Sequence, residues 1–129
     1  MPINNGGNNN QYDGSYIWND YESEQILKSN LRGNATVAPQ NDATLVTVTV
    51  GPEPFYLLGF RASSQGDSLY QLILNGEVIA SRRTMAGVLD CEVHFPGKKK
   101  LKNTDVLILK VTNNFTYDTI NVEGEIYAQ

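Results

Sequence analysis

The residues best suited to chemistry lie in one short stretch, Leu89–Phe95 (LDCEVHF), which holds the only histidine and the only cysteine of the 129-residue chain. Catalysis by a Cys–His pair requires the two side chains to lie within hydrogen-bond reach of each other. Cys91 and His94 are three residues apart, and side chains at an odd spacing point to opposite faces of a strand. We therefore expect a small buried thiol and a surface histidine rather than a dyad.

The same stretch suggests a second kind of chemistry, a divalent-cation site. Asp90, Glu92 and His94 alternate along the sequence, so their side chains share one face of a strand. Carboxylates and imidazole are metal ligands, but any solvated strand shows the same alternation. We predict no metal, no cofactor and no catalytic residue, and expect that the chain is not an enzyme.

Short strands must position these residues, and alternating apolar side chains mark where the strands run. Thr44–Val50 (TLVTVTV) alternates strictly, which is typical of a half-buried strand. Its two predicted faces hold Val46, Val48 and Val50 on one side and Leu45, Thr47 and Thr49 on the other. Gly51–Pro54 ends this strand, because proline cannot donate to a ladder. Phe55–Ala62 forms the next strand, and Gly59 within it predicts a bulge or a close backbone approach.

The clearest turn signal is Asn75-Gly76, because both central residues of a type I′ turn need a positive φ. It predicts a hairpin between Leu69–Leu74 and Glu77–Arg83. Leu89–Phe95 alternates again, with its odd-numbered side chains on the inner face, and Pro96–Lys100 (PGKKK) is predicted to be a turn.

Two further strands close the sequence. Val106–Thr112 (VLILKVT) is apolar on both faces, which favours a central strand or one covered on its second side. Thr119–Tyr127 follows, with Gly124 at a predicted bulge and three apolar side chains expected inward, Ile120, Val122 and Ile126.

Seven or more short strands separated by polar turns predict an all-β fold, an antiparallel β-sandwich of jelly-roll or immunoglobulin-like type. We assign residues 34–129 to this domain and residues 1–33 to an extended polar N-terminal arm. Within the arm, Glu24–Gly33 fits a short helix or an extended segment equally well, because its apolar period is weak.

The arm is rich in Asn and Gly, yet it carries four large aromatic side chains of the kind that anchor interfaces, Tyr12, Tyr16, Trp18 and Tyr21. We expect these aromatics, together with Asp13 and Asp20, to bind a partner. The alternative is that they fold back and cover one sheet of their own domain.

Charge is distributed unevenly along the chain. The net charge is −4, and residues 1–24 hold four acids and no Lys or Arg, so the other ten acids balance the ten bases. An acidic arm disfavours nucleic-acid binding, which needs cations opposite phosphates. The basic groups that could contact an acidic neighbour, such as the arm of an adjacent copy, are Lys98, Lys99, Lys100, Arg82 and Arg83. The alternative for the lysines is a solvated hairpin tip.

The sequence also indicates the cellular compartment in which the chain is made. No apolar run approaches the roughly 20 residues that a membrane-spanning helix needs, so we expect no membrane association. The N-terminal residues lack the charged and apolar regions of a signal peptide, and the single cysteine excludes an intrachain disulfide. We expect synthesis in a reducing cytoplasm.

Three stretches together resemble the small jelly-roll proteins on the virions of tailed bacteriophages, especially capsid decoration (cement) proteins. They are FYLLGFRASSQGDSLYQLILNGEVIASRR, LDCEVHFPGKKKLKNTDVLILKVTN and INVEGEIYA. The resemblance implies a homotrimer on the capsid surface, with the major capsid protein as partner and a terminal arm that reaches across capsomers.

From the resemblance we expect a virion structural protein, made in the host cytoplasm, that binds the outside of a phage head and stabilises the shell. The alternative is a carbohydrate- or receptor-binding module of a tail or fibre. That alternative needs exposed aromatic side chains, for which Tyr56, Tyr70 and Tyr117 are the candidates.

Overall fold

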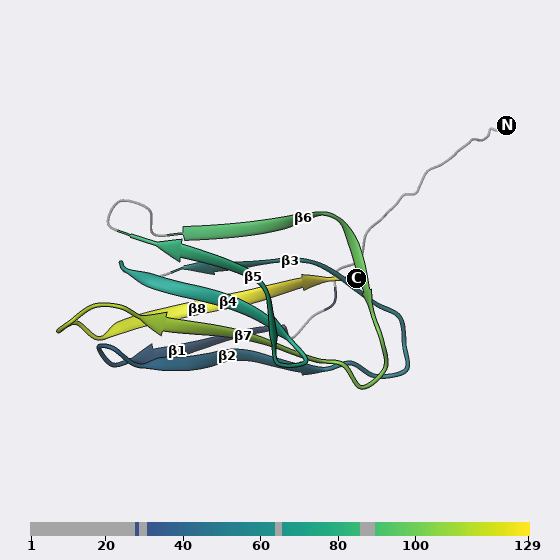
Figure 1. Cartoon of the computed structure of the whole chain (residues 1–129), viewed down its shortest axis with the longest axis horizontal. Helices are drawn as coiled ribbons and strands as arrows, with labels where there is room; N and C mark the ends of the chain where they lie inside the picture. The colour runs from purple at the N-terminus through teal and green to yellow at the C-terminus, as the bar shows by residue number, and fades with distance from the viewer. Residues whose placement is uncertain (1–27, 29–30, 64–65, 86–89) are drawn as a thin grey trace, which may run out of the picture.

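The computed structural model describes residues 28, 31–63, 66–85 and 90–129, and these residues form eight β-strands and no helix (Figure 1). The strands are β1 (Arg32–Val37), β2 (Asp42–Thr49), β3 (Phe55–Ser63), β4 (Ser68–Leu74), β5 (Glu77–Thr84), β6 (Asp90–Leu101), β7 (Val106–Asn113) and β8 (Ile120–Ala128). The aromatic and acidic arm residues lie outside the described part of the chain, as does most of Glu24–Gly33, where a helix or an extended segment was expected.

The strands form two four-stranded antiparallel sheets, ordered β1-β8-β3-β6 and β2-β7-β4-β5. The pairs β1·β8, β2·β7, β3·β6 and β4·β5 are nested, as if one long hairpin had been folded over on itself. This nesting is the jelly-roll topology. The predicted antiparallel β-sandwich is therefore confirmed, and the jelly-roll alternative is the correct one.

The core lies between the sheets and follows the predicted alternation. In β7 every second side chain is buried, and the strand lies between β2 and β4, which confirms the predicted central position. Tyr70 is also part of the core, with no exposed surface, and its hydroxyl donates a 2.7 Å hydrogen bond to the Ser63 carbonyl. Tyr70 was wrongly expected among the exposed aromatics, because its place in the alternation of β4 directs it inward.

Strand β2 departs from the predicted faces at one residue. Val46 and Val50 are both buried, but Leu45 is buried too, although the alternation placed it on the face opposite these valines. The β2·β7 register shifts between Thr44 and Val46, so a bulge directs both neighbouring side chains into the core. Beyond this bulge the exposed Thr47 and Thr49 follow the prediction.

The turn predicted at Pro96–Lys100 is wrong, because these residues continue β6 to Leu101. Strand β6 is an edge strand that pairs only with β3, so the missing N–H of proline disrupts no second ladder. Between the pairs Gly59–His94 and Leu57–Lys99, residues 95–98 of β6 lie opposite Leu58 alone. Four residues against one make a large, irregular bulge. Figure 1 shows β6 bending down over the end of the sandwich.

Glycines allow close approach at two places in the first sheet. Gly59 has a φ of 156°, and a Cβ there would overlap the Val93 carbonyl oxygen, which confirms the predicted close approach. Both β3 ladders also shift register beside it. Gly124 was wrongly predicted to be a bulge. Its pairing with β1 is regular, and the Leu45 and Leu109 side chains pack onto it.

The hairpin predicted at Asn75-Gly76 joins β4 to β5. Asn75 has a φ of 51° and Gly76 a φ of 86°, so both central residues have the positive φ that a type I′ turn requires. The turn leaves β5 as the free edge of the second sheet, next to the edge strand β6 of the first.

The chain is already bonded to the domain before β1 begins. The Lys28 N–H donates to the Ala128 carbonyl, and the Ile126 N–H donates to the Leu31 carbonyl, both at 2.8 Å. Leu31 and Lys28 therefore continue the pairing of β1 along β8, and Lys28 lies at the end of the sandwich that also holds Gln129.

Candidate docking surface

The basic cluster lies on the bent second half of β6, where Lys98, Lys99 and Lys100 are all exposed. The ammonium groups of Lys98 and Lys100 lie 5.3 and 6.0 Å from the ring centroid of Tyr56, which is the register partner of Lys100 on β3. Both distances are within the range of cation–π attraction. Tyr56 therefore holds two positive charges together on the outer face of the first sheet.

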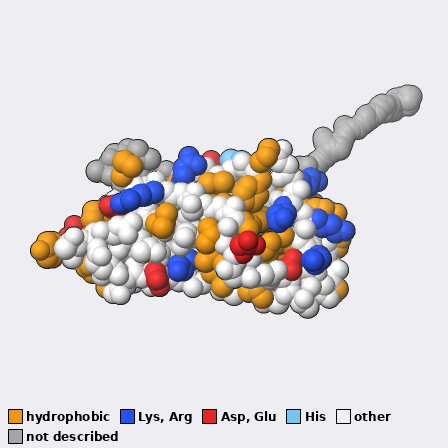
Figure 2. Space-filling model, viewed as in Figure 1, with side chains coloured by type: hydrophobic (Ala, Val, Ile, Leu, Met, Phe, Trp, Pro, Cys, Tyr) orange, Lys and Arg blue, Asp and Glu red, His pale blue; other side chains and the backbone are white. Residues whose placement is uncertain are grey.

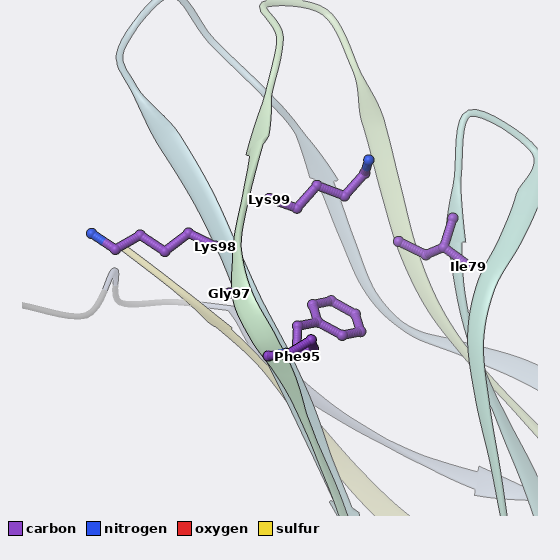
Figure 3. A pocket seen from close by; sticks show the side chains of 6 residues that line it. Ile79, Phe95, Gly97, Lys98 and Lys99 are labelled. Carbon is purple, nitrogen blue, oxygen red and sulfur yellow. The ribbon is translucent and has the colours of Figure 1, made fainter.

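A groove with a volume of about 410 Å³ lies between the two edge strands, and its lining comes from Ile79 on β5 and residues 95–99 on β6. Figure 3 shows Phe95 and Lys99 reaching toward Ile79 across the groove, whereas Lys98 points away from it. The Phe95–Lys98 bulge widens β6 at this point. The edge–groove, as we call this site, has an apolar floor and an ammonium group on its rim.

The surroundings of the edge–groove repeat this combination of apolar and basic groups. Val78, next to Ile79 on β5, keeps 48% of its surface exposed. Figure 2 shows hydrophobic side chains gathered over the middle of this face and Lys and Arg side chains around the end that β6 covers. Such a surface suits a partner that is both apolar and acidic.

The two arginines expected to make contacts between subunits differ in their surroundings. The guanidinium of Arg83 donates two hydrogen bonds to the Asp67 carboxylate, at 3.0 and 3.1 Å, so its charge is already paired within the domain. Arg82 is exposed on the opposite face of β5 from Arg83.

Of the residues first considered for chemistry, Glu92 and His94 lie on the outer face of the first sheet. Cys91 is buried and His94 is exposed, which confirms their predicted opposite faces. The Tyr127 hydroxyl donates a 2.8 Å hydrogen bond to Glu92, whose second carboxylate oxygen lies 3.5 Å from His94 Nε2. The imidazole also stacks on the Tyr127 ring, with centroids 5.5 Å apart. The side chain of Asp90 is outside the described part of the structure.

These contacts influence ionisation. The hydrogen bond from Tyr127 lowers the pKa of Glu92 below its ordinary value, and the neighbouring His94 acts in the same direction. Burial, followed by the bond to Glu92, raises the pKa of Tyr127, so its hydroxyl stays protonated at neutral pH. The arrangement is a stack of paired side chains on an open sheet face. Among the described residues no three His, Cys, Asp or Glu side chains gather as a metal site.

The edge–groove does not follow from the sequence, although the lysines beside it were predicted as contact residues. Ile79 and Phe95 lie on strands of different sheets. The two side chains come close only because the strand order puts β5 and β6 at neighbouring edges of the two sheets. One local signal was present, because Pro96 within an alternating run indicates an edge strand.

Within the described part of the chain no helix is long and apolar enough to span a membrane. No family model and no curated protein matches this chain.

Proposed function

We propose that this chain is a structural protein of a tailed-phage virion, a decoration protein that binds the outer surface of the head and stabilises its shell. Its work is mechanical, and no catalytic step is part of it. The jelly-roll body supplies a rigid block, and the N-terminal arm attaches that block to the major capsid protein and to neighbouring copies.

The observation that carries this proposal is the pairing of Lys28 and Leu31 with β8. These main-chain hydrogen bonds fasten the root of the arm to a central strand of its sheet, so a load on the arm passes directly into the sandwich. The arm begins at the end of the sandwich where Tyr56 gathers Lys98 and Lys100. Many such weak attachments on one shell add up through multivalency.

The alternative, a glycan-binding module, needs exposed aromatic side chains close together, and the three candidate tyrosines do not provide them. Tyr70 is buried, and the other two candidates lie at opposite ends of β8. Tyr117 precedes the strand, and Tyr56 hydrogen-bonds to Gln129 after it, so about nine residues and roughly 30 Å separate them. A sugar ring cannot stack on both.

Sedimentation with phage heads tests the proposal. Purified full-length chain is mixed with undecorated heads of the phage that encodes it and centrifuged through a sucrose gradient, in parallel with a chain lacking residues 1–24. We expect the full chain to migrate with the heads and the truncated chain, still folded by circular dichroism, to stay at the top. Equal migration of both would overturn the role of the arm, and no migration of the full chain would overturn the capsid assignment. Specific binding on a glycan array instead would favour the receptor-binding alternative.

A further inference from the structure

The edge–groove is an exposed, largely apolar surface between the edge strands β5 and β6. Its apolar and basic side chains are complementary to one segment of this chain. We propose that the edge–groove receives residues 16–24 (YIWNDYESE) of a second copy of this chain. The inference rests on the proposed function and deepens it, since it names the surface through which neighbouring copies are linked.

The apolar part of the match is one of size and type. Phe95 and Ile79 line a groove of about 410 Å³, a volume within the range of pockets that bind small organic groups. Within residues 16–24, Tyr16, Trp18 and Tyr21 are such anchors.

The charges complement each other as well. Residues 16–24 carry three carboxylates, on Asp20, Glu22 and Glu24, and no Lys or Arg. The receiving strand presents the consecutive exposed lysines 98–100. Lys98 and Lys99 both belong to the lining of the groove, and the Lys99 side chain is the one that reaches across it. Opposite charges at the rim of an interface favour association and fix its register.

The direction of the chain at the root of the arm favours a second copy over the chain's own groove. Lys28 continues the line of β1, at one edge of the β1-β8-β3-β6 sheet, whereas the edge–groove borders β6 at the other edge. Three strand spacings, about 14 Å, separate these edges. Running backward from Arg32, Leu31 and Lys28 follow β8 toward its C-terminal end, so at Lys28 the chain is directed along the strands and not toward β6.

A neighbouring copy is within reach. Twelve residues separate Tyr16 from Lys28, and an extended chain of that length spans about 40 Å. Reciprocal exchange of arms closes into a dimer, and head-to-tail exchange closes into a ring. In either case residues 1–15 remain free to bind the capsid shell. The arm then has two parts: residues 16–24 link neighbouring copies, and residues 1–15 attach them to the shell.

Light scattering after size exclusion tests the linkage on the purified full chain, without heads. We expect an oligomer whose mass falls to that of the monomer in K98E/K99E, with association at least about tenfold weaker. The matched control is R32E/K110E, which changes the charge equally but lies away from the groove, and its mass should be unchanged. The arm variant D20K/E22K should also be monomeric alone, and mixing it with K98E/K99E should restore association. A monomeric full chain, or an oligomer that survives both reversals, would overturn the proposal.

Cross-linking separates exchange between copies from docking within one chain. In a C91A background, one population carries Trp18→Cys and the other Ile79→Cys, and the two are mixed and oxidised. A disulfide-linked dimer in the mixture supports exchange. A double variant that cross-links only within its own chain at every concentration would contradict it.

Removal of residues 1–15 keeps this test distinct from that of the proposed function. The shortened chain should keep its oligomeric mass and lose binding to heads. Binding without an oligomer refutes the linkage alone, and an oligomer of the full chain without binding refutes the capsid assignment alone.

Discussion

A single tyrosine hydroxyl on the outer face of the first sheet influences how Glu92 ionises. Tyr127 donates to the Glu92 carboxylate and lowers its pKa below the ordinary value of 4.5. A carboxyl group with a lowered folded-state pKa stabilises the fold above its unfolded pKa, and that stabilisation is lost as the pH falls through the folded pKa. The hydrogen bond therefore contributes at neutral pH and disappears in acid.

Replacing Tyr127 with phenylalanine should raise the pKa of Glu92, because the donor of its main hydrogen bond is removed. Carboxyl carbon shifts measured by NMR across an acid titration report this pKa directly. The variant should also lose less stability than the parent chain between about pH 7 and about pH 3 in urea unfolding. The control is Tyr117→Phe at an 89% exposed position, which should leave the titration of Glu92 unchanged. An unchanged Glu92 pKa in Tyr127→Phe would contradict the assignment.

At the scale of elements, the pairing of β3 with β6 depends on one residue without a side chain. Gly59→Ala should destabilise the domain by more than about 2 kcal/mol, because its Cβ would overlap the Val93 carbonyl and its φ disfavours any other residue. Urea unfolding measures the loss. Gly97→Ala, on the bulged part of β6 with open space around it, should change the stability by less than about 0.5 kcal/mol. Similar losses in both variants would show that the close approach does not determine the effect.

The boundary of the domain can be tested in the same way. A chain of residues 28–129 should unfold at the same urea concentration as the full chain when both are monomeric. A chain of residues 34–129 loses two main-chain hydrogen bonds, the first residues of β1 and the half-buried Leu31. We expect the shorter chain to be less stable by about 2–3 kcal/mol. Equal stability of the two fragments would show that residues 28–33 contribute nothing to the fold.

Much of this element structure was predictable, because local rules decide it. Period-two alternation located β2, the first half of β6 and β8, and Asn75-Gly76 located the β4–β5 hairpin through the φ angles it adopts. Strand β1 was not predicted. The errors at Leu45 and at Pro96–Lys100 come from bulges, which depend on the partner strand rather than on the strand's own sequence. The edge–groove was not predictable, because its two walls belong to different sheets.

At the scale of the whole molecule, the described domain is a jelly roll whose edge strands β5 and β6 leave the edge–groove open between them. The arm begins at the end of the sandwich beside this groove. The sequence places the negative excess in residues 1–24, and the structure places exposed lysines on β6 at the end where the arm begins. The arm and the lysines of β6 therefore carry opposite charges, as the proposed docking between copies requires. Its proposed target, a phage head, is supported by the resemblance in sequence and by the jelly-roll topology.

Cryo-electron microscopy of heads incubated with the full chain shows directly what the arm binds. We expect one jelly-roll density per copy on the outer surface, with residues 16–24 of each copy in the edge–groove of its neighbour and residues 1–15 on the major capsid protein. Smooth heads without added density, or jelly rolls that contact the shell through their sheets while the arms touch nothing, would contradict it.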